Sequence, residues 1–144
     1  MSVINFSDQS ADFSLANETQ IVSWLSHIAK DKLFVIEKLN YIFCSDEDVY
    51  AINVQYLQHD YYTDIITFDL SEKENTVLAD VFISIDRVRD NAIQYNQPFQ
   101  HELLRVLSHG LLHLIGYNDK TDEQQIVMTK KENECVGLFF DKFV

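Results

Sequence analysis

The chain has 144 residues, of which 47% are hydrophobic and 24% are charged, with only 3 Gly and 1 Pro. This composition excludes a disordered, collagen-like or linker-rich chain and predicts one domain with a packed core, spanning residues 1–144. The 11 Lys and Arg against 23 Asp and Glu give a net charge of −12 at pH 7, which argues against non-specific binding to polyanions, because such binding depends on neutralising phosphates.

The order of hydrophobic patterns along the chain predicts an α+β fold. In chain order, the predicted elements are an edge strand at 3–6, a helix at 17–33, a strand at 38–45, a helix at 46–57, strands at 64–70 and 77–85, and helices at 86–95, 99–115 and 121–140. Asn17 and Ser45 stand where helix N-caps are expected. The elements predict a small mixed sheet of three or four strands packed by about five helices, and the pairing of the strands at 64–70 and 77–85 stays open. The helix at 99–115 is apolar on most sides and is expected at the centre.

The two cysteines and the N-terminal residues bear on the cellular compartment. Cys44 and Cys135 are expected to be buried thiols rather than a disulfide, since the chain has no C-x-x-C and no sign of secretion. The first residues lack the basic and long apolar regions of a signal peptide. No apolar run reaches the roughly 18 residues of a membrane span. The expected compartment is the cytoplasm, with no membrane partner.

Two histidines four residues apart carry the strongest chemical signal. On the predicted central helix, four residues turn about 400°, so His109 and His113 project from one face, about 40° apart. Gly116 can end the helix, and Asp119 can then place a carboxylate beside the pair. Two imidazoles and one carboxylate leave an open coordination position, which is typical of a catalytic zinc site and indicates metal-assisted hydrolysis. The plainer alternative is two ordinary histidines of a core helix.

Metzincin proteases use the same spacing of ligands, but they carry Glu directly after the first histidine as general base. Gly110 stands at that place here. A metallopeptidase is therefore the second hypothesis, because its proton acceptor is missing.

The stretch HGLLHLIGYND at residues 109–119 resembles the core motif H-G-x-L-H-L-x-G-Y-D-H of the YbeY-type bacterial ribosomal RNA maturation factors. Residues 52–68 and 78–84 resemble two further family blocks, L-N-x-x-Y-R-x-x-D-x-P-T-D-V-L-S-F and L-G-D-I-x-I-S. Residues 121–123, Met128 and Glu132 also fit, and the resemblance covers roughly residues 36–135.

This resemblance implies a metal-dependent single-strand endoribonuclease of ribosomal RNA processing, acting in small-subunit maturation and ribosome quality control. It implies one Zn²⁺ per chain, or another divalent metal, held by His109, His113 and Asp119, with catalysis through that metal and its water. Its implied partners are ribosomal RNA and the ribosome or ribosome-associated proteins.

The chain departs from the family pattern at two chemically important places. Asp119 stands where the family usually has a third histidine, and Leu57 stands where it has an arginine thought to face substrate phosphate. A cation there would stabilise charge in the transition state. The candidate replacements are Arg87, Arg89, Arg105 and Lys120.

The sequence leaves the surroundings of the metal ligands and the type of reaction open. Because RNA must approach a protein of net charge −12, we expect a local basic or hydrogen-bonding rim around the cleft. Four residues could line that cleft or be ordinary turn and strand residues: Thr63, Asp64, Asp80 and Ser84. The rival functions are a metallopeptidase-like or other metal-dependent hydrolase, and a non-catalytic ribosome assembly factor with a structural metal.

Overall fold

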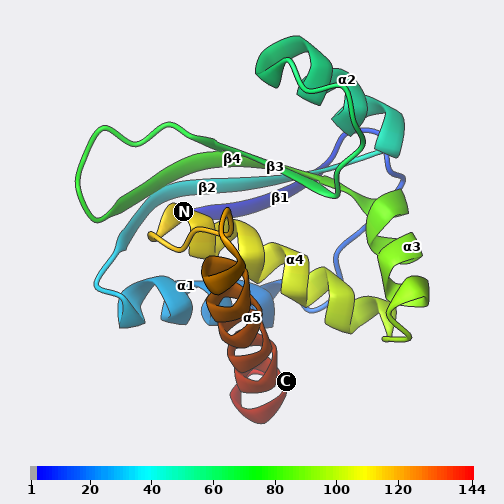
Figure 1. The fold of residues 1–144 in the computed structure, drawn as a ribbon. Helices are drawn as coiled ribbons and strands as arrows, with labels where there is room; N and C mark the ends of the chain where they lie inside the picture. The colour runs from blue at the N-terminus through cyan, green and yellow to red at the C-terminus, as the bar shows by residue number, and fades with distance from the viewer. Residues whose placement is uncertain (1–2) are drawn as a thin grey trace.

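The computed structural model describes residues 3–144 and confirms the α+β fold. Within these residues the chain forms four strands and five helices (Figure 1). They are β1 (Ile4–Asp8), α1 (Glu18–Asp31), β2 (Val35–Cys44), α2 (Asp46–Leu57), β3 (Ile65–Asp69), β4 (Thr76–Ser84), α3 (Ile85–Gln94), α4 (Phe99–Leu114) and α5 (Asp122–Lys142). Each predicted element exists, with bounds that differ by a few residues.

The strands form one mixed sheet in the order β1-β2-β4-β3. β1 is parallel to β2 and β2 is parallel to β4, whereas β3 runs antiparallel to β4. The strands at 65–69 and 76–84 therefore do pair, with Ile65 opposite Ile83 and Asp69 opposite Ala79. β1 lies at one edge of the sheet, as expected for the first strand.

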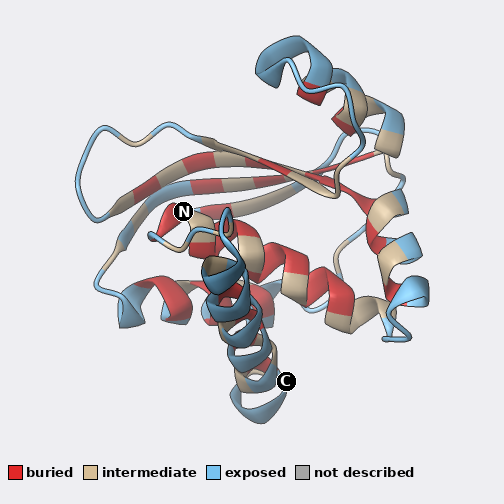
Figure 2. Ribbon diagram, viewed as in Figure 1, coloured by how far each residue is buried: buried red, intermediate tan, exposed pale blue. Residues whose placement is uncertain are grey.

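The two faces of the sheet are covered differently. Along β4, Val77, Ala79, Val81 and Ile83 are buried, and the residues between them are half-buried. This inner face packs against α1 and α4, and α5 packs on those two helices, whereas α2 packs on the other face (Figures 1 and 2). α4 is buried along most of its length, which confirms its predicted central place.

Two buried hydrogen bonds fix the helices that carry the site. The Tyr41 hydroxyl of β2 donates to the carbonyl of Leu107 in α4 at 2.9 Å. Burial raises the pKa of Tyr41, so the hydroxyl keeps the proton that it donates. The indole N–H of Trp24 in α1 donates to the carbonyl of Cys135 in α5 at 2.8 Å. α4 is thereby held on the sheet and α5 on α1.

The two predicted N-caps and the two predicted buried thiols are found in the structure. The Ser45 side chain accepts a hydrogen bond from the backbone N–H of Asp48, as an N-cap should. Asn17 is the N-cap of α1, as expected, but it has a left-handed conformation, φ 59°, and its side chain makes no capping hydrogen bond. Cys44 and Cys135 are free and buried, and burial raises the pKa of both thiols to about 11.

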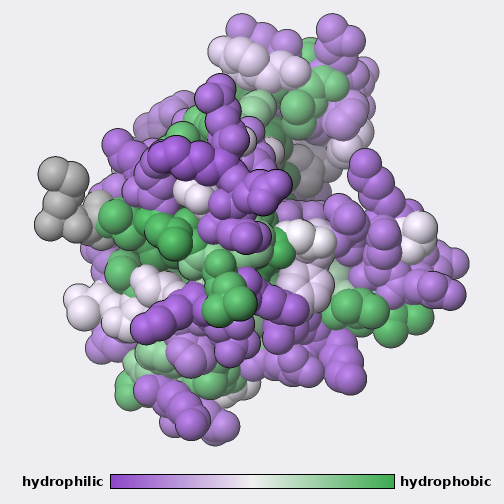
Figure 3. Space-filling model, turned by 90° about the vertical axis from the view of Figure 1, so that its left-hand side faces the viewer, coloured by the Kyte–Doolittle hydropathy of each residue, from purple (hydrophilic) through white to green (hydrophobic). Residues whose placement is uncertain are grey.

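The face of the molecule shown in Figure 3 is mostly hydrophilic, in keeping with the composition. On the face shown in Figure 3, hydrophilic side chains surround a smaller apolar area. Among residues 3–144, no helix combines the length and the apolar character that crossing a bilayer requires.

Candidate metal centre

α4 places His109 and His113 one turn apart near its C-terminal end. Their Nε2 atoms are 3.0 Å apart, and the two rings are nearly perpendicular, at 83°. Their side chains are 17% and 30% exposed, respectively. The two imidazoles therefore share one face of the helix, as the spacing predicts, and direct one nitrogen each toward the same point.

Gly116 turns the chain back toward these imidazoles. Gly116 has φ +110°, a backbone conformation in which a residue with a side chain would be strained. Its N–H donates to the carbonyl of His113 at 3.2 Å, and the N–H of Tyr117 donates to that of Leu112 at 3.0 Å. This pair of hydrogen bonds is a Schellman motif, which ends the helix and reverses the chain direction. The predicted glycine bend is confirmed.

The start of α5 anchors the returning segment that carries Asp119. The side chain of Gln124 accepts from the backbone N–H groups of Lys120 and Thr121, at 3.0 and 3.2 Å. The Thr121 hydroxyl in turn accepts from the N–H of Gln124 at 3.1 Å. This capping box fixes the backbone directly after Asp119.

The three candidate ligand atoms fit one divalent metal ion. Asp119 Oδ2 is 3.5 Å from His109 Nε2 and 3.3 Å from His113 Nε2, and all three atoms lie within 4.8 Å of one another. Tetrahedral bonds of about 2.0–2.1 Å separate ligand atoms by about 3.3 Å, which matches these distances. The arrangement of donors therefore suits a metal site.

Glu132, on α5, orients the first of these histidines. Its carboxylate is hydrogen-bonded to Nδ1 of His109. Because a carboxylate only accepts, Nδ1 carries the proton and Nε2 presents its lone pair to the cluster. Glu132 is 4% exposed, so this contact is shielded from water. A carboxylate behind a ligating histidine fixes the tautomer and the orientation of the ring.

A half-buried arginine, Arg105, holds Glu132 in place. Arg105 Nη1 is 3.2 Å from Glu132 Oε1, and Nε and Nη2 donate to both oxygens of Glu102 at 2.9 and 2.6 Å. Nη2 also lies 3.7 Å from Asp64. The hydrogen bond to Glu102 raises the pKa of Arg105. One guanidinium thus balances two nearly inaccessible carboxylates, Glu102 and Glu132.

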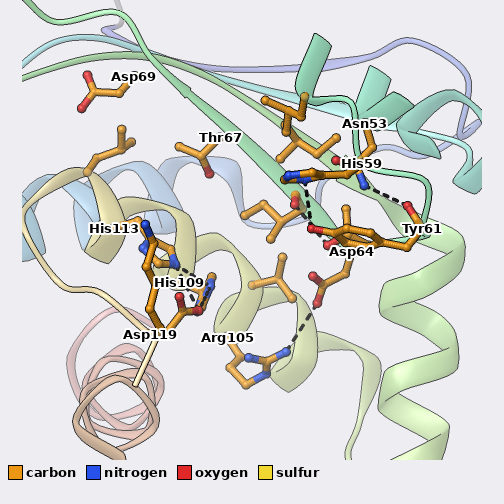
Figure 4. A pocket seen from close by; sticks show the side chains of 17 residues that line it. Asn53, His59, Tyr61, Asp64, Thr67, Asp69, Arg105, His109, His113 and Asp119 are labelled. Carbon is orange, nitrogen blue, oxygen red and sulfur yellow. Dashed lines mark hydrogen bonds and ion pairs between the residues drawn. The ribbon is translucent and has the colours of Figure 1, made fainter. Parts of the chain in front are cut away.

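A cavity of about 710 Å³ opens in front of the three ligand atoms (Figure 4). It is lined by Asn53, Leu57, His59, Tyr61, Thr63, Asp64, Ile65, Ile66, Thr67, Asp69, Arg105, Val106, His109, His113, Leu114, Asp119 and Lys120. Its charged lining consists of three carboxylates and two cations, and amide, hydroxyl and imidazole groups surround them. The rim is therefore hydrogen-bonding rather than basic. Burial raises the pKa of Asp64 in this wall, while the charge of Arg105 lowers it.

Some of the predicted cleft residues lie elsewhere. Thr63 and Asp64 line the cavity, as does Leu57, the position of the family arginine. Asp80 instead accepts a hydrogen bond from Asn40 at 3.0 Å, between β4 and β2. Ser84 caps α3. Of the two alternatives for Asp80 and Ser84, the structure supports ordinary strand residues, because their positions direct them to partners outside the cavity.

Of the four cations that the sequence offers as replacements for the arginine, two line the cavity and two do not. Arg105 and Lys120 line the cavity. Arg87 forms an ion pair with Asp46 at 2.8 Å, and Arg89 lies over the ring of Phe99. Arg87 and Arg89 are therefore not cations of the cavity, because both side chains interact with residues outside it.

Gly110 occupies a position without room for a general base. A Cβ there would lie 2.9 Å from Ile65 Cδ1 and 3.4 Å from Val81 Cγ1. The helix face after His109 thus rests against β3 and β4, away from the three ligands. A glutamate at this position would point into the core, which removes the feature that the metallopeptidase hypothesis needs.

Glu132 is the residue of this site to which the sequence pattern assigned no role. It stands among the buried positions of α5, with Met128, Cys135 and Phe139, at alternating spacings of four and three residues. A carboxylate at a core-facing position needs a partner, because burying an unpaired charge is costly. That irregularity in the apolar stripe is the signal from which its role can be read.

Comparison with known proteins agrees with these features. The family model described as endoribonuclease YbeY matches residues 3–139. The protein named endoribonuclease YbeY of Cytophaga hutchinsonii is 48% identical over 135 residues, covering 94% of this chain and 94% of the relative. The protein of the same name from Flavobacterium johnsoniae is 44% identical over 137 residues, covering 95% and 97%. A Thermotoga maritima protein of known solution structure superposes with a TM-score of 0.69 at 27% identity, covering 96% of this chain and 90% of that one.

Proposed function

Because the chain belongs to the YbeY endoribonuclease family, we propose that it cuts single-stranded RNA in the cavity in front of His109, His113 and Asp119. The observation that carries the proposal is the convergence of these three ligand atoms at 3.0, 3.3 and 3.5 Å beside that open cavity. The substrate is ribosomal RNA during ribosome maturation, and the partners are the ribosome and its associated proteins, in the cytoplasm.

His109, His113 and Asp119 would hold one divalent metal ion, and Zn²⁺ suits two imidazoles and a carboxylate. When bound, such an ion supplies Lewis-acid stabilisation of charge on a phosphate oxygen and lowers the pKa of water. Glu132 keeps His109 in the tautomer that ligation requires. Asp119 makes the ligand set harder than three imidazoles, so another divalent metal is the alternative occupant.

Lys120 is the best placed cation for the substrate phosphate. It lines the cavity directly after the ligand Asp119, and within residues 3–144 no carboxylate forms an ion pair with it. Arg105 lines the same cavity, but its donors are taken by Glu102 and Glu132. Lys120 therefore takes over the charge that Leu57 cannot supply.

RNA binding should depend only weakly on salt. Each phosphate neutralised on a single strand contributes about −0.7 to the slope of log K against log salt. One lysine and one metal contact predict a slope of about −1 to −2, and Lys120→Gln should bring it about 0.7 closer to zero. Fluorescence anisotropy with a labelled single-stranded RNA over a salt series measures this slope. A slope of about −4 or steeper would instead reveal a basic surface outside the cavity.

Glu132→Gln should weaken metal binding about 10- to 100-fold. An amide orients His109 less firmly than a carboxylate does, and it supplies no negative charge behind this ligand. Competition against a chromophoric chelator measures the affinity. The matched control is Glu134→Gln, since Glu134 lies on the same helix, is 53% exposed and pairs with Lys131 at 3.5 Å. Equal affinities of the two variants would show that Glu132 has no role behind His109.

The experiment that tests the function is a cleavage assay on single-stranded RNA with the metal-loaded, the chelator-treated and the reloaded protein. The proposal predicts cleavage that the chelator abolishes and the divalent metal restores. Cleavage of peptides without cleavage of RNA would favour the metallopeptidase. A melting temperature that falls on chelation, with RNA left intact in every form, would favour the non-catalytic assembly factor.

A further inference from the structure

The connection between α2 and β3 presents two aromatic side chains to the cavity. His59 and Tyr61 line it (Figure 4), and their rings stack with centroids 5.2 Å apart and an interplanar angle of 20°. The Tyr61 hydroxyl and His59 Nδ1 are also hydrogen-bonded, at 3.0 Å. In Figure 4 the pair stands on the wall formed by the α2–β3 connection, across from the histidines of α4.

The backbone beneath these rings is held by a buried amide. Asn53 is 1% exposed, and its side chain donates to the carbonyl of Tyr61 at 2.8 Å. The N–H of His59 donates to the carbonyl of Asn53 at 3.0 Å. The two rings are therefore carried by a short connection that is tied at both residues to the last turns of α2.

The neighbouring Tyr62 differs in every relevant respect. Its ring stacks on Tyr50 at 4.4 Å, its hydroxyl donates to Glu47 at 3.0 Å, and the guanidinium of Arg87 lies 5.4 Å from its centroid. It does not line the cavity. Within residues 3–144, the side-chain hydrogen bond and the ring stacking of Tyr61 are both made with His59, and Tyr61 stays 53% exposed. Of the two tyrosines, only Tyr61 thus offers apolar ring surface to a molecule in the cavity.

We propose that Tyr61, supported by His59, is a stacking platform for one nucleobase of the RNA strand, next to the phosphate that lies at the ligand cluster. The inference rests on the proposed function, which brings RNA into this cavity. Aromatic rings bind unpaired bases by stacking and tolerate any base sequence, because every base has a π-face. Bases within a duplex are already stacked on both faces. The platform therefore selects single strands without reading sequence.

The test measures binding of a labelled single-stranded oligoribonucleotide in the presence of EDTA, so that the RNA stays intact. Tyr61→Ala should weaken binding about 5- to 100-fold, the range found for loss of one base–aromatic stack. Tyr61→Phe keeps the ring and should retain affinity within about threefold. Tyr62→Ala removes a tyrosine outside the cavity and should leave affinity unchanged, and melting temperatures of the variants check their folding.

An oligonucleotide series with a single abasic site, moved along the strand, completes a double-mutant cycle. One abasic position should weaken binding to the wild type and have no further effect on Tyr61→Ala. Equal affinity of wild type and Tyr61→Ala, or no binding of the oligonucleotide by the wild type, would overturn the platform. RNA cleavage by the metal-loaded wild type is scored separately: cleavage without dependence on Tyr61 refutes only the platform, and binding through Tyr61 without cleavage refutes only the nuclease.

Discussion

Replacing His113 by alanine is expected to reduce RNA cleavage by about 1000-fold or more. The substitution removes one of three ligand atoms, and the remaining two, His109 Nε2 and Asp119 Oδ2, are 3.5 Å apart and bind a metal far more weakly. Loss of the several kcal/mol that a metal contributes to transition-state stabilisation corresponds to this factor. Initial rates on a labelled single-stranded RNA, at a divalent metal concentration that just saturates the wild type, measure it.

The matched control is His101→Ala, because His101 lies on the same helix but outside the cluster and stacks on Phe140, with centroids 4.6 Å apart. The cleavage rate of His101→Ala should stay near that of the wild type. Cooperative thermal melting should show that both variants are folded. Full activity of His113→Ala would mean that cleavage occurs at another site or comes from another protein.

Replacing Arg105 by methionine is expected to lower the free energy of unfolding by about 3–5 kcal/mol, the usual consequence of leaving a buried charge without its partner. Glu102 and Glu132 are 2% and 4% exposed, and Arg105 is hydrogen-bonded to both. Urea unfolding, followed by the fluorescence of Trp24, measures the change in the midpoint.

Two further variants separate charge from packing. The double variant Arg105→Met with Glu102→Met should recover part of the lost stability, since apolar side chains can replace a buried ion pair. Arg89→Met removes an exposed arginine of similar size, which lies 5.8 Å from the ring of Phe99, and should change stability by less than about 1 kcal/mol. A similarly small effect for Arg105→Met would mean that the guanidinium is not needed to balance the two carboxylates.

Local patterns in the sequence were enough to predict the elements and the core of the site. Helical periodicity placed α4 within a residue of its observed end, because Gly116 follows the last apolar turn. The spacing of His109 and His113 determined their common face, since that geometry is a property of the helix alone. Asp119 could be added because only a short turn separates it from α4.

The rest of the site depends on contacts between segments far apart in the chain. The carboxylate behind His109 comes from α5, and the aromatic wall of the cavity comes from the connection that follows α2. Neither follows from periodicity, because each requires the order of the strands and the crossing of α4 and α5. Asp80 illustrates another limit of the sequence. The alternation of polar and apolar residues correctly predicted the strand β4, but it did not reveal which face of that strand borders the cavity.

The metal content of the purified protein, measured by elemental analysis alongside the variant Asp119→Ala, tests the metal centre directly. Asp119 is chosen because it is the candidate ligand that differs from the histidine implied by the sequence resemblance, and its side chain is 38% exposed, so the substitution should not disturb folding. We expect one divalent ion per wild-type chain and much less than one per chain in the variant. Wild-type protein that stays free of bound metal in the presence of excess Zn²⁺, Mn²⁺ or Mg²⁺ would contradict this expectation.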